Sequence, residues 1–317
     1  MTVVVLGAGA VGSLFAARLV RSGRSVELVG RADHVAAIRA NGLTVLDPTP
    51  ETYRLRAETE LAAGTEAEAV FLTVKTFDLE RAATELARAI PRPVPTLLTQ
   101  NGLGIEPTAH AALASGGWTA PAAWAVRAVH SVPATWVRPG VVRAAGEGEL
   151  LLPVPEERPE SAAVLRYFAR LLTDAGLLVR AVPRFEREVW RKALVNAAIN
   201  PVTATHGVEN GRLLEGPERA EALALLAEAR RAAALAGHDF SEAESVRDFE
   251  RVARATAANR SSMLQDLERG RPTEIESISG EIVRIAAARG VDLPRTRAIV
   301  EEVRRRTRRT TSVPQPS

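Results

Sequence analysis

The stretch V-V-V-L-G-A-G-A-V-G at residues 3–12 determines the fold class predicted for the first half of this chain. Residues 3–6 are a short run of β-branched and apolar side chains, which is typical of a buried strand. Glycines follow at positions 7, 9 and 12, and residues 13–22 have the apolar spacing of a helix. A second strand pattern at residues 25–29 completes a β-α-β unit of about 30 residues.

Each glycine of this G-x-G-x-x-G string has its own role in a dinucleotide-binding turn. Gly7 permits the tight turn, Gly9 lets the backbone approach a pyrophosphate, and Gly12 lets the helix pack closely on the strand. The helix N-terminus offers unpaired N–H groups and a positive dipole end to phosphates. A purely structural glycine-rich turn is the alternative. The segment predicted to bind a cofactor is Gly7, Ala8, Gly9, Ala10, Val11 and Gly12.

The residues after the second strand favour one cofactor over another. NAD sites place an Asp or Glu there for the ribose hydroxyls, whereas this chain has Gly30 followed by Arg31. A carboxylate repels a 2′-phosphate, and a guanidinium binds it with two hydrogen bonds. Arg31 therefore favours NADP(H) over NAD(H), although stray arginines are common in an Arg-rich chain.

The alternation of strands and helices continues through the first half. Residues 70–74 and 96–99 are buried-strand candidates with a helix at 78–90 between them, which predicts a parallel sheet with right-handed crossovers. Turn signals between residues 122 and 153 predict antiparallel strands that extend the sheet edge. A helix at 160–175 and a strand at 177–182 complete an α/β domain of the Rossmann type with a doubly wound sheet.

The second half contains no convincing strand pattern. Ala/Leu/Arg-rich helical stretches dominate, with breaks predicted at Pro201, Gly237, Gly270 and Gly290. The predicted organisation is a nucleotide-binding domain at 1–182, an all-α substrate and catalytic domain at 183–303, and a disordered Arg-rich tail at 304–317.

Composition excludes several classes of protein. Arginines 304, 305, 306, 308 and 309 carry five of the positive charges, so removing them from the net +3 leaves 3 − 5 = −2 for the rest. That balance argues against a nucleic-acid partner, and no apolar run is long enough to cross a bilayer. The chain has no cysteine and its five histidines lack ligand spacing, which argues against disulfides, thiol catalysis and a metal site. We expect a cytoplasmic protein.

Only two lysines, Lys75 and Lys192, occur among 41 basic residues. An ammonium can give up its proton, whereas a guanidinium remains charged, so these positions are candidates for proton chemistry. Lys75 follows the strand at 70–74, and Asn101 follows the strand at 96–99. Ligands bind at this carboxyl edge of a parallel sheet. For the two lysines, the alternative is that they survive by chance on a solvated face. For Asn101 with Gly102, the alternative is an ordinary Asn-Gly turn.

Two further polar groups stand out in the second half. Lys192, Asn196 and Asn200 recur at i, i+4 and i+8, so they share one helical face, predicted as a polar seam beside a core. A solvated stripe is the alternative, and Pro201 is predicted to end that helix. Thr273 followed by Glu276 predicts a capping box, which would place Glu274 in a first helical turn.

Taken together, these motifs resemble the ketopantoate reductase (2-dehydropantoate 2-reductase) family over about residues 2–294. The similarity rests on G-A-G-A-V-G at 7–12, V-K at 74–75, Q-N-G at 100–102, K-A-L-V-N-A-A-I-N-P at 192–201, S-S-M-L-Q-D at 261–266 and T-E-I-E at 273–276. It is weakest between residues 110 and 143. The resemblance implies hydride transfer from NADPH to ketopantoate, giving (R)-pantoate for pantothenate and coenzyme A biosynthesis.

The resemblance also implies residue roles. Lys192 matches the family's general acid, and Glu274 matches the carboxylate that holds the substrate hydroxyl. Lys75 and Asn101 match residues that contact cofactor and substrate, and Arg31 matches the 2′-phosphate contact. The matching substrate-binding positions are Asn196, Asn200, Asn210, Asn259 and Ser262.

The expected partner is a small 2-keto acid, and the oligomeric state, a homodimer included, is left open by the sequence. Two other functions compete with the family reaction. One is reduction of another bulky 2-keto acid, branched-chain or aromatic, on the same scaffold. The other is a non-catalytic NADP(H)-binding sensor, against which the intact Lys192, Asn196 and Glu274 argue.

Overall fold

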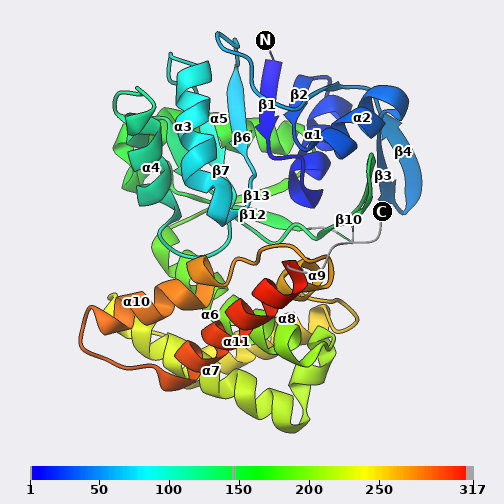
Figure 1. Ribbon diagram of the computed structural model, residues 1–317. Helices are drawn as coiled ribbons and strands as arrows, with labels where there is room; N and C mark the ends of the chain where they lie inside the picture. The colour runs from blue at the N-terminus through cyan, green and yellow to red at the C-terminus, as the bar shows by residue number, and fades with distance from the viewer. Residues whose placement is uncertain (1, 145, 147, 312–317) are drawn as a thin grey trace. The chain divides into compact units, whose positions relative to one another are not determined.

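The computed structural model describes residues 2–144, 146 and 148–311, and the chain separates into two compact units (Figure 1). The first unit runs up to Gln100 and continues with Ile105–Phe185. The second unit consists of Asn101–Gly104 and the chain from Glu186 onward. A segment of four residues, Asn101–Gly104, thus belongs to the second unit although the chain on either side of it belongs to the first.

A six-stranded parallel sheet organises the first unit, as the sequence predicted. Its order is β5-β2-β1-β6-β7-β8, and every neighbouring pair is parallel. The central strands carry apolar residues on both faces because helices cover both. The strands are β1 (Thr2–Leu6), β2 (Ser25–Val29), β5 (Arg56–Glu58), β6 (Ala69–Leu72), β7 (Thr96–Leu98) and β8 (Ala125–Arg127).

Successive residues of β1 enter two different cores. Val3 and Val5 join Phe15 and Phe168 on one face of the sheet, and Val4 lies in the core of the other face. Helices α1 and α5 cover the first face, while α3 and α4 cover the second (Figure 1). The helices of this unit are α1 (Ala10–Arg21), α2 (Ala32–Asn41), α3 (Leu79–Ala89), α4 (Ile105–Ser115) and α5 (Ala162–Asp174), with short turns η1 (Thr76–Asp78), η2 (Pro121–Ala123), η3 (Pro155–Glu157) and η4 (Pro159–Ser161).

The predicted antiparallel extension of the main sheet is wrong, because β8 is its last strand and the remaining strands form two other sheets. One has the order β10-β11-β3-β4, in which β11 pairs parallel with β3. The other has the order β13-β12-β9. Their strands are β3 (Leu43–Asp47), β4 (Thr49–Tyr53), β9 (Val129–His130), β10 (Ala134–Arg138), β11 (Val141–Ala144), β12 (Glu149–Pro153) and β13 (Leu178–Val182).

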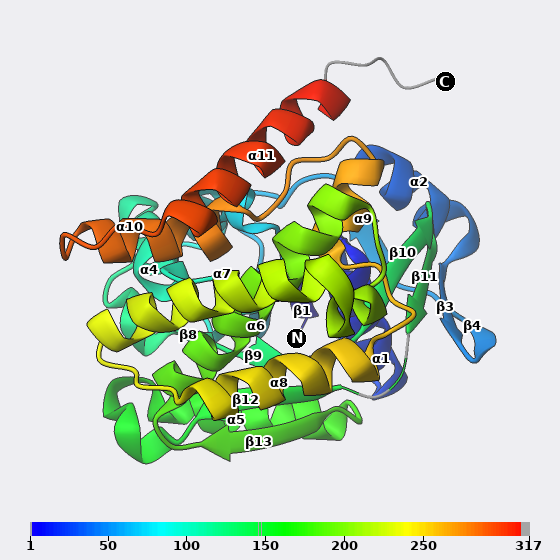
Figure 2. The same ribbon diagram turned by 90° about the horizontal axis from the view of Figure 1, so that it is seen from below.

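The second unit is helical, and the described residues after β13 contain no strand. Helix α7 packs against α8, α10 and α11 (Figure 2). Gly237, Gly270 and Gly290 all have positive φ just beyond helix ends, so three of the predicted breaks are confirmed. The elements are α6 (Phe185–His206), η5 (Asn210–Leu214), α7 (Gly216–Leu235), α8 (Glu242–Ala255), α9 (Ser262–Glu268), the π-helical turn η6 (Glu276–Gly280), α10 (Glu281–Ala287) and α11 (Pro294–Thr311).

The fourth predicted break, at Pro201, is wrong because α6 continues through it to His206. The three residues directly beyond the proline are buried, and two of them, Val202 and Thr203, are fully inaccessible. Packing of this last part of the helix offsets the backbone hydrogen bond that proline cannot donate.

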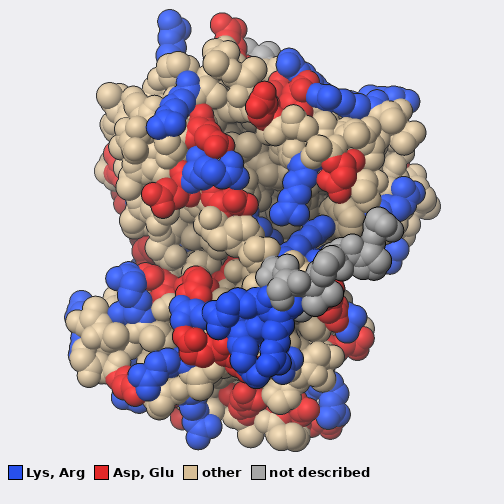
Figure 3. Space-filling view, in the orientation of Figure 1, with Lys and Arg blue, Asp and Glu red and all other residues tan. Residues whose placement is uncertain are grey.

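The predicted disordered tail is wrong for residues 304–311, which belong to α11, while residues 312–317 lie outside the described residues. Arg305 and Arg306 pair with Glu302 at helical spacings of three and four residues, and Val303 is buried. Such pairs on one face support a helix. Basic side chains accordingly gather, with acidic ones among them, over the end of α11 in the space-filling view (Figure 3).

A carboxylate from α7 caps the N-terminus of α11. Glu228 is buried and accepts hydrogen bonds from Arg295 N at 3.1 Å, Thr296 N at 2.8 Å and Thr296 Oγ1 at 2.7 Å. The first N–H groups of a helix have no partner within it, so Glu228 satisfies donors that would otherwise be buried unpaired.

We expect Glu228→Gln to lower the free energy of unfolding by about 1–3 kcal/mol, since the neutral side chain cannot accept all three hydrogen bonds. Urea denaturation followed by circular dichroism measures the change. Glu221→Gln is the control, because Glu221 is a partly exposed residue of the same helix that pairs with His206. Equal stability of the two variants would contradict the capping role.

A buried histidine joins three elements of the first unit. His34 Nδ1 accepts a hydrogen bond from Gly140 N at 2.9 Å, and His34 Nε2 lies 3.1 Å from Ser13 Oγ. With Nδ1 as the acceptor, the neutral ring carries its proton on Nε2 and donates to Ser13. Burial lowers the pKa of His34 below its usual value, although the charge of Asp33 opposes the shift.

The lowered pKa of His34 predicts a loss of stability in acid. Below pH 6.5, the ordinary value, the unfolded chain binds a proton at this ring that the folded chain excludes. The free energy of unfolding then falls by up to about 1.4 kcal/mol per pH unit until the folded ring is protonated. Urea denaturation between pH 5 and 7.5 measures this slope. His34→Gln should flatten it, and an unchanged slope in that variant would contradict the assignment.

Candidate functional site

The turn between β1 and α1 requires glycine at two positions. Gly7 has φ 120°, and a Cβ there would lie 2.5 Å from Val74 N. At Gly12 a Cβ would lie 2.1 Å from the carbonyl oxygen of Gly7. The tight turn predicted for Gly7 and the close helix–strand packing predicted for Gly12 are therefore both present.

Gly9 differs from the other two because the space beside it is open. A Cβ built there meets no heavy atom of the described chain within 4 Å. Gly9 is also the N-cap of α1, with no side-chain cap and no acidic residue in the first turn, which includes Ala10 and Val11. The backbone N–H groups at this end of α1 are thus available to an anion, and the turn fits a dinucleotide pyrophosphate.

Two residues that the sequence analysis missed hold this turn and the adjacent strand ends. Thr73 Oγ1 donates to Gly7 O at 2.7 Å. Gln100 Nε2 donates to Leu72 O at 2.8 Å and to Val74 O at 3.2 Å, and Gln100 Oε1 is buried without a hydrogen-bond partner among the described residues. Gln100 lies in the Q-N-G motif, but neither side chain was assigned a role, because their partners are backbone carbonyls distant in sequence.

The same edge of the sheet carries Arg31 and Lys75, since β2, β1 and β6 are adjacent parallel strands. Arg31 is the exposed N-cap residue of α2, and no ion pair engages it within the described part of the chain. The nearby Glu27 is buried in β2 and pairs with Arg56 at 3.2 Å. Lys75 precedes η1 and is half-buried. Arg31 is therefore a cation at the carboxyl end of β2 that could contact a ligand.

In the second unit, α6 carries the predicted polar seam. Lys192 and Asn196 are half-buried and Asn200 is 7% exposed, so the face is not a solvated stripe. Trp190 and Leu194 on the same helix are buried in the core.

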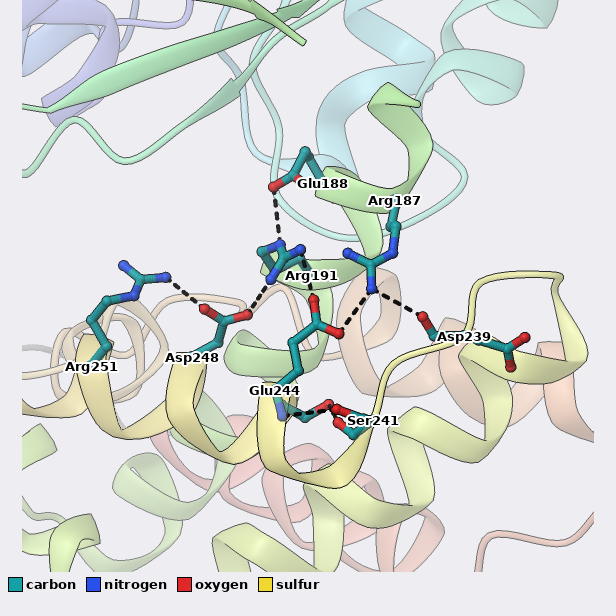
Figure 4. A network of polar contacts seen from close by, with 9 residues as sticks. Arg187, Glu188, Arg191, Asp239, Ser241, Glu244, Asp248 and Arg251 are labelled. Carbon is teal, nitrogen blue, oxygen red and sulfur yellow. Dashed lines mark hydrogen bonds and ion pairs between the residues drawn. The ribbon is translucent and has the colours of Figure 1, made fainter. Parts of the chain in front are cut away.

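A network of charged residues fixes the first half of α6 against α8 (Figure 4). Arg191 pairs with Glu188, Glu244 and Asp248, and Arg187 donates to Glu244 at 2.9 Å. The hydrogen bond from Arg187 lowers the pKa of Glu244, so that carboxylate stays charged well into acid. Because Arg191 directly precedes Lys192 in the chain, the network also sets the rotation of the helix at Lys192.

The second half of α6 is joined to α9 by two hydroxyl groups that the sequence analysis missed. Thr203 Oγ1 lies 2.6 Å from Ser261 Oγ, which also accepts from Leu264 N at 3.1 Å and so caps α9. Ser262 begins that helix and is exposed. The cap thus places Ser262 relative to Asn200, three residues before Thr203.

Asn210 and Asn259 are brought together by the backbone. Asn210 N donates to Asn259 O at 2.9 Å, and Asn210 Nδ2 donates to Thr256 Oγ1 at 2.9 Å. Asn210 Oδ1 is buried and has no hydrogen-bond partner among the described residues. Asn259 is exposed.

Asn101 belongs with Glu274 in the second unit. Asn101 Nδ2 donates to Glu274 Oε2 at 3.3 Å, and Glu274 is only 6% exposed. The predicted capping box is wrong, because Thr273 Oγ1 has no hydrogen-bond partner in the described chain and the following turn is π-helical without a side-chain cap. The burial of Glu274 beside an amide donor fits a carboxylate that holds a ligand hydroxyl.

The described residues contain no cluster of three or more His, Asp or Glu side chains that could hold a metal ion. Across the same part of the chain, every helix is too short or too polar to cross a membrane. The two polar sets are thus the glycine turn with Arg31 and Lys75 at the sheet edge of the first unit, and a Lys/Asn/Glu set in the second. The roles predicted for their residues remain predictions.

Two family models match the chain. The model described as ketopantoate reductase PanE/ApbA matches residues 3–157, and its C-terminal counterpart matches residues 184–307. Together they cover both units.

Curated relatives and solved structures agree with these models. The 2-dehydropantoate 2-reductase of Archaeoglobus fulgidus is 36% identical, over 95% of this chain and 96% of its own. That of Halobacterium salinarum is 33% identical, over 96% and 98%. The crystal structure of a ketopantoate reductase from Ralstonia eutropha has a TM-score of 0.85 at 28% identity, covering 98% of this chain and all of that one. With matches that span nearly its whole length, the chain belongs to the ketopantoate reductase family.

Proposed function

We propose that this protein catalyses the NADPH-dependent reduction of 2-dehydropantoate to (R)-pantoate. The observation that carries the proposal is the polar seam of α6, in which Lys192 and Asn196 are half-buried beside the buried Asn200. A lysine held in this way supplies a proton donor, and asparagines on the same face supply hydrogen bonds to a carboxylate and a carbonyl. The names of the relatives from Archaeoglobus fulgidus and Halobacterium salinarum, both more than 30% identical, support the substrate.

NADPH is the proposed cofactor because of the residues at the carboxyl edge of the sheet. The open space beside Gly9 and the uncapped start of α1 suit the pyrophosphate. Arg31 suits a 2′-phosphate, and Lys75 adds a second positive charge at that edge. When bound, the cofactor supplies a hydride to the carbonyl carbon of the substrate.

Lys192 is the proposed general acid. As the carbonyl carbon is reduced, negative charge develops on the carbonyl oxygen, and a nearby ammonium both stabilises that charge and protonates the oxygen. Arginine at this position stabilises charge but does not readily release a proton.

Glu274 and the asparagines are proposed to orient the substrate. Glu274 Oε2 accepts from Asn101 Nδ2, and the Glu274 carboxylate is proposed to accept a hydrogen bond from the substrate hydroxyl. Asn196 and Asn200, with Ser262 at the start of α9, are assigned to the substrate carboxylate and carbonyl. Asn210 and Asn259 complete the set by holding the chain that leads to α9.

We expect Lys192→Ala and Lys192→Arg each to lower kcat for ketopantoate by about 10²–10⁴-fold, since both remove the proton donor. NADPH oxidation, followed by absorbance, measures kcat, and cofactor fluorescence measures NADPH binding, which should not change. Lys192→Arg is the matched control for charge. A kcat near that of the wild type in either variant would contradict the assignment of Lys192 as the general acid.

A panel of 2-keto acids separates ketopantoate from other substrates of the same scaffold. We compare kcat/KM for ketopantoate with that for 2-ketoisovalerate and phenylglyoxylate. The proposal requires ketopantoate to give the highest value. NADPH binding without turnover of any of the three would instead favour a non-catalytic sensor.

Arg31→Ala should raise the KM for NADPH by about tenfold or more and leave the KM for NADH unchanged, because only NADPH loses a charge-assisted contact. Arg88→Ala is the control. Arg88 is an exposed arginine in the last turn of α3, which leads back to the opposite, amino edge of the sheet. An equal rise in the KM values for NADPH and NADH would show that Arg31 does not bind the 2′-phosphate.

A further inference from the structure

The turn that follows Glu274 is wound as a π-helix. Gly280 N donates to Ile275 O at 2.9 Å, five residues back, and Ser277 Oγ donates to Glu274 O at 3.1 Å. Ile275 and Ile278 are buried on its inner side. Single π-helical turns are rare and need support from their surroundings. The direction of the Glu274 side chain depends on this turn, because Glu274 lies two residues before η6 and its backbone oxygen accepts from Ser277 within the turn.

The segment Asn101–Gly104 packs on the same turn. Leu103 N donates to Ser277 O at 2.8 Å, and a Cβ on Gly102 would lie 2.3 Å from that same oxygen. Gly102 also has φ 92°, which disfavours any other residue. This close backbone contact is what brings Asn101 Nδ2 to Glu274, so η6 sets the positions of both side chains.

A guanidinium from α11 holds the outer side of the turn. Arg304 Nε and Nη2 donate to Glu276 Oε1 and Oε2, each at 2.6 Å, and Arg304 also pairs with Glu301 on its own helix. The hydrogen bond to Glu276 raises the pKa of Arg304 above its usual value. Two parallel hydrogen bonds fix the carboxylate plane as well as its distance, which a single contact does not.

Because the Arg304–Glu276 pair is partly exposed, its effect on the free energy of unfolding can be distinguished from its effect on the position of η6. The side chains of Arg304 and Glu276 are 38% and 58% exposed. Pairs in such a solvated setting add little to the free energy of unfolding. Their geometry nevertheless ties Arg304 in the second half of α11 to Glu276, the first residue of η6. Loss of the pair should thus leave the fold intact and loosen the turn.

We propose that Arg304 is a positioning residue, which holds η6 through Glu276 so that Glu274 and Asn101 keep their orientation for the substrate. The inference rests on the proposed function for its catalytic readout. It assigns a task to an arginine that the sequence analysis placed in a disordered tail. Arg304 acts through Glu276 and touches no substrate.

The first test compares Arg304→Gln with Arg305→Gln. Arg305 neighbours Arg304 but pairs with Glu302 on its own helix, so its replacement makes the same change of charge away from η6. We expect kcat/KM for ketopantoate to fall about tenfold in Arg304→Gln and to stay near wild type in Arg305→Gln. The melting temperatures of the two variants should agree. Equal kcat/KM values in Arg304→Gln and Arg305→Gln would overturn the proposal. A loss of kcat/KM in Arg304→Gln that is accompanied by a matching drop in melting temperature would also overturn it.

A double-mutant cycle tests whether Arg304 works through the proposed partners. Glu276→Gln should reproduce the loss seen in Arg304→Gln, and the double variant should lose no more than either alone. Arg304→Lys retains the charge and loses the paired geometry, so it should not restore kcat/KM. Additive losses in the double variant, or full activity in Arg304→Lys, would contradict a role in orientation.

Hydrogen exchange decides the question without any substrate. Arg304→Gln should speed exchange in peptides that cover residues 101–104 and 276–280. The amide of Leu103 donates to Ser277 O in η6, and the amide of Gly280 donates to Ile275 O within the turn itself. Peptides from α7 should exchange as in the wild type. Unchanged exchange at Leu103 and Gly280 would overturn the proposal. If the wild-type protein reduces no 2-keto acid, the proposed function fails while this measurement still judges the role of Arg304.

Discussion

Burial of α6 on nearly all sides is the constraint on which the second unit depends. Ala198 and Val202 are inaccessible, and the polar residues Asn200 and Thr203 are buried in the same interior. A buried polar group is costly unless a partner satisfies it. The chain provides such partners at both ends, through Arg191 with the acids of α8 and through Thr203 with Ser261. Lys192 lies between these two fixed points.

The first unit could be predicted well because its signals are local. Strands β1 and β2 and the glycine turn between β1 and α1 follow from residues that are neighbours in sequence, and the closest neighbour of a Cβ at Gly12 is the carbonyl oxygen of Gly7 in the same turn. The second sheet gave no such signal. Strand β4 is mostly exposed, and β3 pairs with β11, about 100 residues later, so no local alternation of apolar residues marks the pairing.

Three local rules failed where a tertiary contact overrode them. Pro201 remains within α6 because the helix beyond it is buried, and α11 extends past Arg304 because its arginines find acidic partners. Glu276 bonds to Arg304 instead of returning to Thr273. The site residues were found mainly from motif and spacing. The contact of Thr73 with Gly7 and that of Thr203 with Ser261, which hold those residues in place, were missed because the two partners of each contact lie far apart in sequence.

The assignment of Asn101–Gly104 to the second unit means that the chain enters that unit twice. The contact between Gly102 and the carbonyl of Ser277 tolerates no side chain, so this short insertion and its receiving turn must match each other in shape. The two halves are consequently not interchangeable modules. A chimera joined at residue 185 would take Asn101–Gly104 from one parent protein and the turn that contacts this segment from the other. We expect such a chimera to fold only when the segment and the turn come from closely related parents.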